Sequence, residues 1–219
     1  PLRTRSVEKI IAEFFGGEDS FLVRGSGTNA LRLSFIELLK NENQILVHDA
    51  PIYKTSEFNL KSMKVNILKY NFNDLSNLDT FIKENKIKVV LLQHTRQQLK
   101  DKYNLKEVIN EIKSIDSTIK IIVDDNYAVC KTKENGVEMG ADITAFSTFK
   151  LLGPVGIGVI VGNKNLISNM KKNNYSGGSQ VQGFEAMEVL RGLVYAPVSL
   201  SIQAREIEKL KKILSNDLR

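Results

Sequence analysis

The sequence has little cysteine and no long apolar run, and each shortage excludes a class of protein. Cys130 is the only cysteine in 219 residues, which excludes an internal disulfide and is typical of a reducing compartment. The longest apolar runs, such as Val89 to Leu92 and Ile121 to Val123, are far too short to span a bilayer. Nothing at the start resembles a signal peptide. We therefore expect a cytoplasmic protein with no membrane partner.

Histidine is equally scarce, and the positive charge is not gathered in one place. His48 and His94 are the only histidines, and no Cys/His spacing predicts a metal site. The formal net charge is +6, but many lysines alternate with acids, as in Glu107 to Lys113. Such scattered charge is typical of solvated helix faces. We expect neither a metal ion nor a nucleic-acid partner.

The overall composition is that of an ordinary globular domain, with 42% hydrophobic and 26% charged residues. The chain opens at Pro1 without a methionine and closes in an amphipathic helical stretch from Ile202 to Leu214. We expect residues 1–219 to form one domain of a longer protein, cut at both ends.

Short β-branched runs alternate with segments of helical periodicity along the whole chain. The predicted strands are Phe21–Arg24, Gln44–His48, Lys64–Leu68, Lys88–Gln93, Lys120–Asp124, Ile143–Ser147 and Gly158–Gly162. The predicted helices are Val7–Phe15, Thr28–Leu39, Leu75–Asn85, Leu105–Ile115, Leu166–Lys172 and Phe184–Leu193. This alternation predicts an α/β fold of three layers, α/β/α, around a mostly parallel sheet.

A glycine-rich turn after the first strand has two interpretations. Gly25-Ser26-Gly27-Thr28 opens a helix, and the free N–H groups of a helix start bind phosphate. Extended to Ala30, the turn also matches the dinucleotide fingerprint, and Asp49 follows about 20 residues later, where a ribose-binding acid belongs. A Rossmann dehydrogenase domain that uses Gly25–Ala30 and Asp49 to bind NAD is therefore an alternative, as is a purely structural turn.

Two further strand ends carry an acid and a lysine. Asp124, with Tyr127 three residues later, follows one strand, and a carboxylate there can hold a proton on a pyridine nitrogen. Ser147 and Lys150 follow the next strand, where apolar neighbours favour a nucleophilic amine. Taken singly, Asp124 is also typical of an Asx turn at the surface, and Lys150 is also typical of an exposed loop lysine. A phosphate turn, an acid and a lysine in this order, each at the carboxyl end of a strand, are more specific than any one alone.

The same three elements resemble the signature of fold-type-I enzymes that depend on pyridoxal 5'-phosphate (PLP), the aspartate aminotransferase-like superfamily. The resemblance covers nearly the whole chain and includes Gly140-Ala141-Asp142-Ile143 ahead of Ser147. Gln93-His94-Thr95-Arg96 and Asp124-Asp125-Asn126-Tyr127-Ala128-Val129 are similar to a bacterial branch, the YhfS-like proteins. That branch is related to the trans-sulfuration lyases and the aluminium-resistance proteins.

The resemblance implies a role for each matched residue. Lys150 would form the Schiff base with PLP, and Asp124 would pair with the pyridine nitrogen. Tyr127 would lie near the ring oxygen, and Tyr53 would stack on the ring. The phosphate would be held by Ser26, Gly27, Thr28 and Ser147.

The resemblance also implies partners, and the sequence departs from the family in places. Arg96 is a candidate for gripping a substrate carboxylate, although a solvent-facing arginine is the alternative. Gly177 to Gln180 is similar to a loop that reaches the phosphate of a neighbouring subunit, so we expect a homodimer. Phe149 stands where the lyases usually have a hydroxyl, and the N-terminal arm and the smaller C-terminal domain are expected to be missing.

Together these observations predict the large domain of a PLP-dependent enzyme that acts on an amino acid, as a transferase or a carbon–sulfur lyase. Two alternatives stay open at this point. One is the NAD-binding dehydrogenase domain, and the other is a catalytically silent domain that serves as an interaction module.

Overall fold

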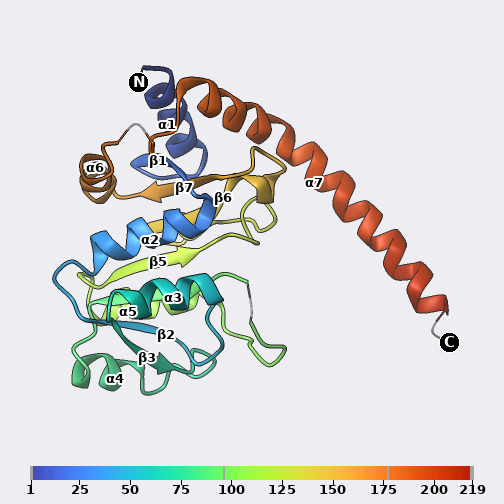
Figure 1. Ribbon diagram of the computed structural model, residues 1–219. Helices are drawn as coiled ribbons and strands as arrows, with labels where there is room; N and C mark the ends of the chain where they lie inside the picture. The colour runs from blue at the N-terminus through green and yellow to red at the C-terminus, as the bar shows by residue number, and fades with distance from the viewer. Residues whose placement is uncertain (1, 96, 177, 218–219) are drawn as a thin grey trace.

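A single mixed sheet organises the protein in the computed structural model, which describes residues 2–95, 97–176 and 178–217, with side chains up to residue 215. Its strands are β1 (Asp19–Arg24), β2 (Gln44–His48), β3 (Asn66–Tyr70), β4 (Val89–Gln93), β5 (Lys120–Asp124), β6 (Ile143–Ser147) and β7 (Ile157–Gly162). They lie in the order β1-β7-β6-β5-β4-β2-β3 (Figure 1).

Strand β7 alone breaks the parallel arrangement of the described strands, because it runs antiparallel to both β1 and β6. All other neighbours, from β6 across to β3, are parallel. Since β7 reverses direction relative to both neighbours, β1 and β6 point the same way. The carboxyl ends of β1, β4, β5 and β6 therefore meet at one edge of the sheet, and the predicted mostly parallel sheet is confirmed.

Helices cover both faces of the sheet. They are α1 (Leu2–Phe14), α2 (Ser26–Leu38), α3 (Lys54–Ser62), α4 (Leu78–Glu84), α5 (Leu105–Ile115), α6 (Lys164–Asn173) and α7 (Gly183–Asp217), with a 3-10 turn, η1 (Thr148–Leu151). In β4, Leu91 belongs to the apolar cluster that includes residues of α2 and α6, whereas Val90 and Leu92 belong to the cluster that includes residues of α4 and α5. Residues of a strand alternate between faces, so a strand buried on both sides is apolar throughout. The predicted three-layer α/β/α architecture is confirmed.

Most other elements begin or end a few residues from their predicted bounds, and three elements differ as follows. Helix α3 was not predicted, because only Ser56 and Leu60 in it are buried and its apolar periodicity is weak. Strand β3 begins at Asn66 rather than Lys64, because Lys64 adopts a positive φ of 57° in the turn after α3. The predicted helix from Phe184 to Leu193 is the first part of a much longer one.

Helix α7 is continuous over 35 residues and includes Pro197. Leu193, Ala196 and Leu200 are buried at helical spacing against α1 and β7, so packing continues through the proline. Beyond Leu200 the described side chains are exposed, and Figure 1 shows this half of α7 projecting away from the sheet. None of the described helices is both long and apolar enough to cross a membrane.

The free edge of β1 is closed by Glu8 of α1. The Leu22 N–H donates to Glu8 Oε1 at 3.0 Å, and Lys171 Nζ lies 3.1 Å from Glu8 Oε2. Burial raises the pKa of Glu8, and the charge of Lys171 opposes that rise. The carboxylate therefore satisfies an edge-strand donor that would otherwise be unpaired.

Replacing Glu8 with alanine is expected to lower the free energy of unfolding by about 2 kcal/mol, because it leaves the buried Leu22 N–H without an acceptor and removes one of the two acids that pair with Lys171. Urea denaturation followed by circular dichroism measures the change. Glu13→Ala is the matched control, since Glu13 is exposed on the same helix. Equal unfolding midpoints for the two variants would contradict the role given to Glu8.

Candidate active site

A pocket opens where the carboxyl ends of β1, β4, β5 and β6 meet. It is lined by Ser26, Gly27, Thr28, Leu31, Tyr53, Thr55, Gln93, Thr95, Gln97, Asp124, Asn126, Tyr127, Ser147, Phe149 and Lys150. The residues predicted to hold PLP, namely Ser26, Gly27, Thr28, Tyr53, Asp124, Tyr127, Ser147 and Lys150, are all in this lining. Asp49 does not line the pocket, and Arg96 lies outside the described residues.

The glycine turn places the start of α2 at one wall of the pocket. Gly25 has a φ of 95°, which favours glycine, and the N–H groups of Gly25 and Ser26 donate to the Gly156 carbonyl at 2.8 and 3.0 Å. Helix α2 has no side-chain N-cap. Among the described contacts, the N–H groups of Gly27 and Thr28 have no acceptor. These two donors at the positive end of a helix remain available to an anion.

Ser147 adds a third uncommitted donor. Its side chain is 1% exposed at the end of β6, and its Oγ has no hydrogen-bond partner within the described part of the chain. A buried hydroxyl without a partner costs about 1–3 kcal/mol, so its persistence indicates an external acceptor. A buried hydroxyl and two free N–H groups on the wall of one pocket fit a phosphate group.

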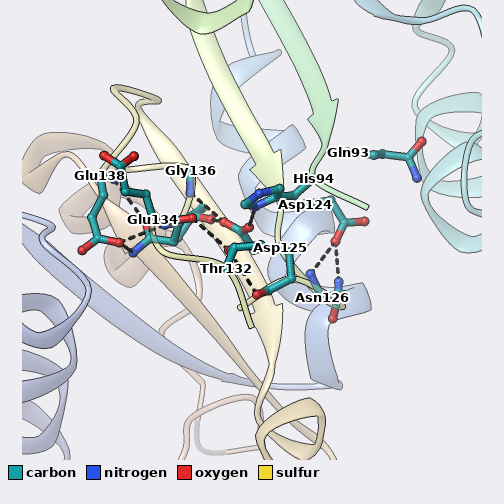
Figure 2. Close-up of polar contacts among 12 residues, drawn as sticks. Gln93, His94, Asp124, Asp125, Asn126, Thr132, Glu134, Gly136 and Glu138 are labelled. Carbon is teal, nitrogen blue, oxygen red and sulfur yellow. Dashed lines mark hydrogen bonds and ion pairs between the residues drawn. The ribbon is translucent and has the colours of Figure 1, made fainter. Parts of the chain in front are cut away.

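Two adjacent aspartates at the end of β5 point to different surroundings (Figure 2). Asp124 lines the pocket, and its Oδ1 accepts hydrogen bonds from Asn126 N at 3.1 Å and Asn126 Nδ2 at 2.7 Å. Asp125 is fully buried beneath, where it contacts His94. Only Asp124 can therefore reach a molecule bound in the pocket.

The pKa of Asp124 lies above its ordinary value, chiefly because burial penalises the charged form. The hydrogen bonds from Asn126 oppose that rise, the charge of Asp125 adds to it, and the charge of Lys150 opposes it. A carboxylate in such surroundings gains from a cationic partner. A protonated pyridine nitrogen is a partner of that kind.

Replacing Asp124 with asparagine is expected to raise the melting temperature of the cofactor-free protein at neutral pH. The folded-state pKa is raised, so ionised Asp124 destabilises the fold at pH values above it, and the neutral amide removes that penalty. The advantage should shrink as the pH falls through the raised pKa and vanish below the ordinary value of 3.8, where both states are protonated. Thermal melts across this pH range test the sign, and a destabilised variant at neutral pH would contradict it.

Lys150 presents its amine to the same pocket from the turn η1. Its Nζ lies 3.7 Å from the centroid of the Tyr127 ring and 4.4 Å from that of Phe149. Thr148 holds the turn. Its hydroxyl donates to backbone carbonyl oxygens, with Oγ1 2.6 Å from that of Pro154 and 3.1 Å from that of Ile157. The amine is thus held between two aromatic rings rather than left free in a loop.

The structure also brings in polar residues to which the sequence assigned no role in the site. Asn126 hydrogen-bonds Asp124, and Gln93, Thr55, Thr95 and Gln97 line the pocket. Gln93 is the register partner of Asp124 on the neighbouring strand. Their position directly after strands was the available signal, but nothing in the residue types alone distinguished them from ordinary loop residues.

The dinucleotide alternative finds no support in the topology. A Rossmann site needs the strand of the glycine turn beside the strand that ends in the ribose-binding acid. Here β7, β6, β5 and β4 stand between β1 and β2. Asp49 is exposed at the end of β2, with Lys69 Nζ 3.9 Å away. The spacing in sequence is therefore not matched by proximity in space.

Comparisons with known proteins agree with this geometry. The uncharacterized protein YhfS of Escherichia coli K12 is 42% identical over 215 residues, which are 98% of this chain and 59% of the relative. The crystal structure of the pyridoxal-5'-phosphate dependent protein YhfS from Escherichia coli matches with a TM-score of 0.92, at 42% identity, over 98% of this chain and 59% of that one. The chain thus spans less than two thirds of the length of these relatives.

More distant structures share the fold. A putative cystathionine beta-lyase involved in aluminium resistance from Listeria monocytogenes has a TM-score of 0.76 at 22% identity, over 89% of this chain and 55% of that one. Yeast cystathionine gamma-lyase has a TM-score of 0.71 at 21% identity, over 89% of this chain and 51% of that one.

A family model described as Cys/Met metabolism PLP-dependent enzyme matches residues 2–217, nearly the entire chain. The expected resemblance to fold-type-I PLP enzymes of the YhfS-like branch is confirmed by this match and by the relatives above. The chain belongs to the Cys/Met metabolism family of PLP-dependent enzymes, and its cofactor is pyridoxal 5'-phosphate.

Proposed function

We propose that the complete protein is a PLP-dependent carbon–sulfur lyase that acts on a sulfur-containing amino acid, with the cofactor attached at Lys150. The observation that carries the proposal is one pocket that gathers a lysine amine, a carboxylate and an unpartnered buried hydroxyl. The family's link to cysteine and methionine metabolism supports the substrate class.

Each end of the cofactor has candidate contacts. Ser147 and the turn of Ser26, Gly27 and Thr28 would hold the phosphate, as their free donors suggest. Asp124 would pair with the pyridine nitrogen. Tyr127 would lie near the ring oxygen, and Tyr53, half exposed in the pocket lining, would cover a face of the ring. Bound PLP supplies an electron sink for the negative charge left when a bond to the substrate Cα breaks.

The side chains around Lys150 would then manage the proton. The Lys150 Nζ would take the proton from the substrate Cα, and the rings of Tyr127 and Phe149 would keep water away from the amine. Asp124, held by Asn126, would keep a fixed negative charge at the opposite end of the cofactor. The elimination would release the sulfur-bearing group as a thiol.

The substrate would meet an uncharged polar surface. Gln93, Thr95, Gln97 and Thr55 line the pocket with amide and hydroxyl groups. These groups suit the carboxylate and side chain of a small amino acid. The role of Arg96 in binding a substrate carboxylate stays a prediction.

The test is a product assay on the full-length protein loaded with PLP. A carbon–sulfur lyase given cysteine or cystathionine releases ammonia, a keto acid and a thiol or sulfide without a second substrate. An aminotransferase, the alternative within the superfamily, releases no ammonia and requires an added keto acid. Ammonia and thiol in equal amounts would support the lyase, whereas transfer that depends on a keto acid would overturn it in favour of the aminotransferase.

We also propose that the complete protein is a cytoplasmic homodimer. The single cysteine in residues 1–219 suits a reducing compartment. Exposed apolar side chains on α7, such as Phe184, Tyr195 and Val198, are suited to an interface. The loop ending at Gln180 is expected to reach the phosphate of the neighbouring subunit. Analytical ultracentrifugation of the full-length protein tests the dimer, and a monomer at micromolar concentration would contradict it.

A further inference from the structure

Two histidine–aspartate pairs, one buried and one largely buried, lie near the pocket edge of the sheet without lining the pocket. His48 Nε2 lies 3.0 Å from Asp101 Oδ1, and His94 Nδ1 lies 2.5 Å from Asp125 Oδ1. The proposed reaction uses neither pair. The second one stands where β4 and β5 end, directly beside Asp124, and therefore raises the question of what it does for the site.

The carboxylate of Asp125 has three hydrogen-bond partners, of which His94 and Gly136 are labelled in Figure 2. His94 contacts Oδ1, while the Gly136 N–H donates to Oδ2 at 2.8 Å and Thr144 Oγ1 donates to the same oxygen. An ionised carboxylate only accepts hydrogen bonds, so His94 Nδ1 must carry the hydrogen. The end of β4, strand β6 and the loop that contains Gly136 are thereby tied to one buried group.

The backbone of Asp125 links this buried group to the pocket. Its N–H donates to the Ala145 carbonyl at 3.0 Å, and its carbonyl accepts from the N–H groups of Ala128 and Val129, each at 3.0 Å. The His94 N–H donates to the Asp124 carbonyl at 3.1 Å. Asp125 thus begins the turn that carries the pocket residues after β5.

Loss of the His94 donor would leave a fully buried carboxylate short of a partner. Such a group shifts towards another donor. A shift of Asp125 would move the turn that begins there and carries the pocket residues, so the loss of His94 would reach the cofactor without direct contact.

We propose that His94 is a positioning residue of the cofactor site, which fixes Asp125 and through it the presentation of Asp124, Asn126 and Tyr127. The inference rests on the proposed function, because it assigns the effect to the PLP site. The two neighbouring acids then have separate roles, since Asp124 faces the cofactor while Asp125, together with His94, holds Asp124 in place.

The experiment measures PLP affinity and the absorbance spectrum of the bound cofactor in the full-length protein. His94→Phe keeps a ring and removes the donor, whereas His94→Asn places an amide nitrogen near the position of Nδ1. We expect His94→Phe to weaken PLP binding about 10-fold or more, the scale of one lost hydrogen bond to a charged group, and to change the absorbance band. His94→Asn should recover most of the affinity and the wild-type spectrum.

Thr144→Val is the second probe, because it removes the other side-chain donor to Asp125 with little change in shape. Thr144→Val should also weaken PLP binding and change the absorbance band. It keeps the test informative if His94→Phe fails to fold. His48→Phe is the matched control, since it breaks the other buried pair. It should lower stability and leave the PLP spectrum unchanged.

The outcomes separate this inference from the proposed function. If the wild-type protein does not bind PLP, the proposed function fails. If the wild-type protein binds PLP and His94→Phe binds it equally well, the positioning role is overturned. The role is also overturned if His94→Asn is no better than His94→Phe, or if His48→Phe changes the spectrum as much, because both results indicate a general loss of packing.

Discussion

Replacing Lys150 with alanine is expected to lower the activity of the full-length protein by about a thousandfold or more, because it removes the proposed attachment point of the cofactor and the proposed proton carrier. Bound PLP should lose the absorbance band near the edge of the visible range that borohydride abolishes in the wild-type protein. Unfolding should change little, within about 0.5 kcal/mol, because the side chain is partly exposed and carries no structural hydrogen bond among those described.

Lys150→Arg is the control for charge. It keeps a cation beside the rings of Tyr127 and Phe149 but supplies no amine that can bond to the cofactor. Both variants should therefore be equally inactive. Activity retained in Lys150→Arg would show that the residue acts only through its charge, and the account of the site would be wrong.

The second large effect is expected at Gly158 in β7, which packs directly against the glycine turn. A Cβ added there would lie 2.2 Å from the backbone oxygen of Ser26, a contact that no side-chain rotation relieves. Gly158→Ala should therefore displace the start of α2 and lower the free energy of unfolding by about 2–3 kcal/mol. Because the displaced turn is the proposed phosphate-binding site, PLP binding should weaken by about 10-fold or more.

Gly183→Ala is the matched control, because an added Cβ there meets only the side chain of Arg3 and the residue does not line the pocket. Fluorescence titration with PLP and thermal melts measure both effects. Wild-type affinity in Gly158→Ala would contradict the claim that the turn of Ser26, Gly27 and Thr28 binds the phosphate.

Elements with a strong local signal were predicted to the residue. Strands β2, β5 and β6 and helix α5 have the bounds that the sequence predicted. Each of these strands is a short apolar run bounded by polar or turn residues, and α5 is strongly amphipathic and begins at the side-chain cap of Asn104. Where burial is partial, as in β3 and α3, the periodicity was too weak to fix the bounds or to reveal the helix.

The site was predictable in part because parallel strands bring their carboxyl ends together. That rule placed Asp124, Ser147 and Lys150 near one another before any contact was known, and the structure puts all three in one pocket. It does not reveal which way a side chain turns. Asp124 and Asp125 are indistinguishable in sequence, and only the fold shows that the second is buried against His94.

The same limit explains the ambiguity of the glycine turn. The fingerprint from Gly25 to Ala30 and the later Asp49 match a dinucleotide site in spacing, and spacing is all that a sequence offers. The reversal at β7 places β1 at the far edge of the sheet, beside β7 rather than β2. The pairing of β1 with β7, two strands distant in sequence, therefore rules out the dinucleotide arrangement.

The most direct test of the account is to trap the cofactor on the chain. The full-length protein would be loaded with PLP, reduced with borohydride, digested and mapped by mass spectrometry. We expect one modified peptide, which spans the end of β6 and carries the label on Lys150. A label on any other lysine, or no label on a protein that binds PLP, would contradict it.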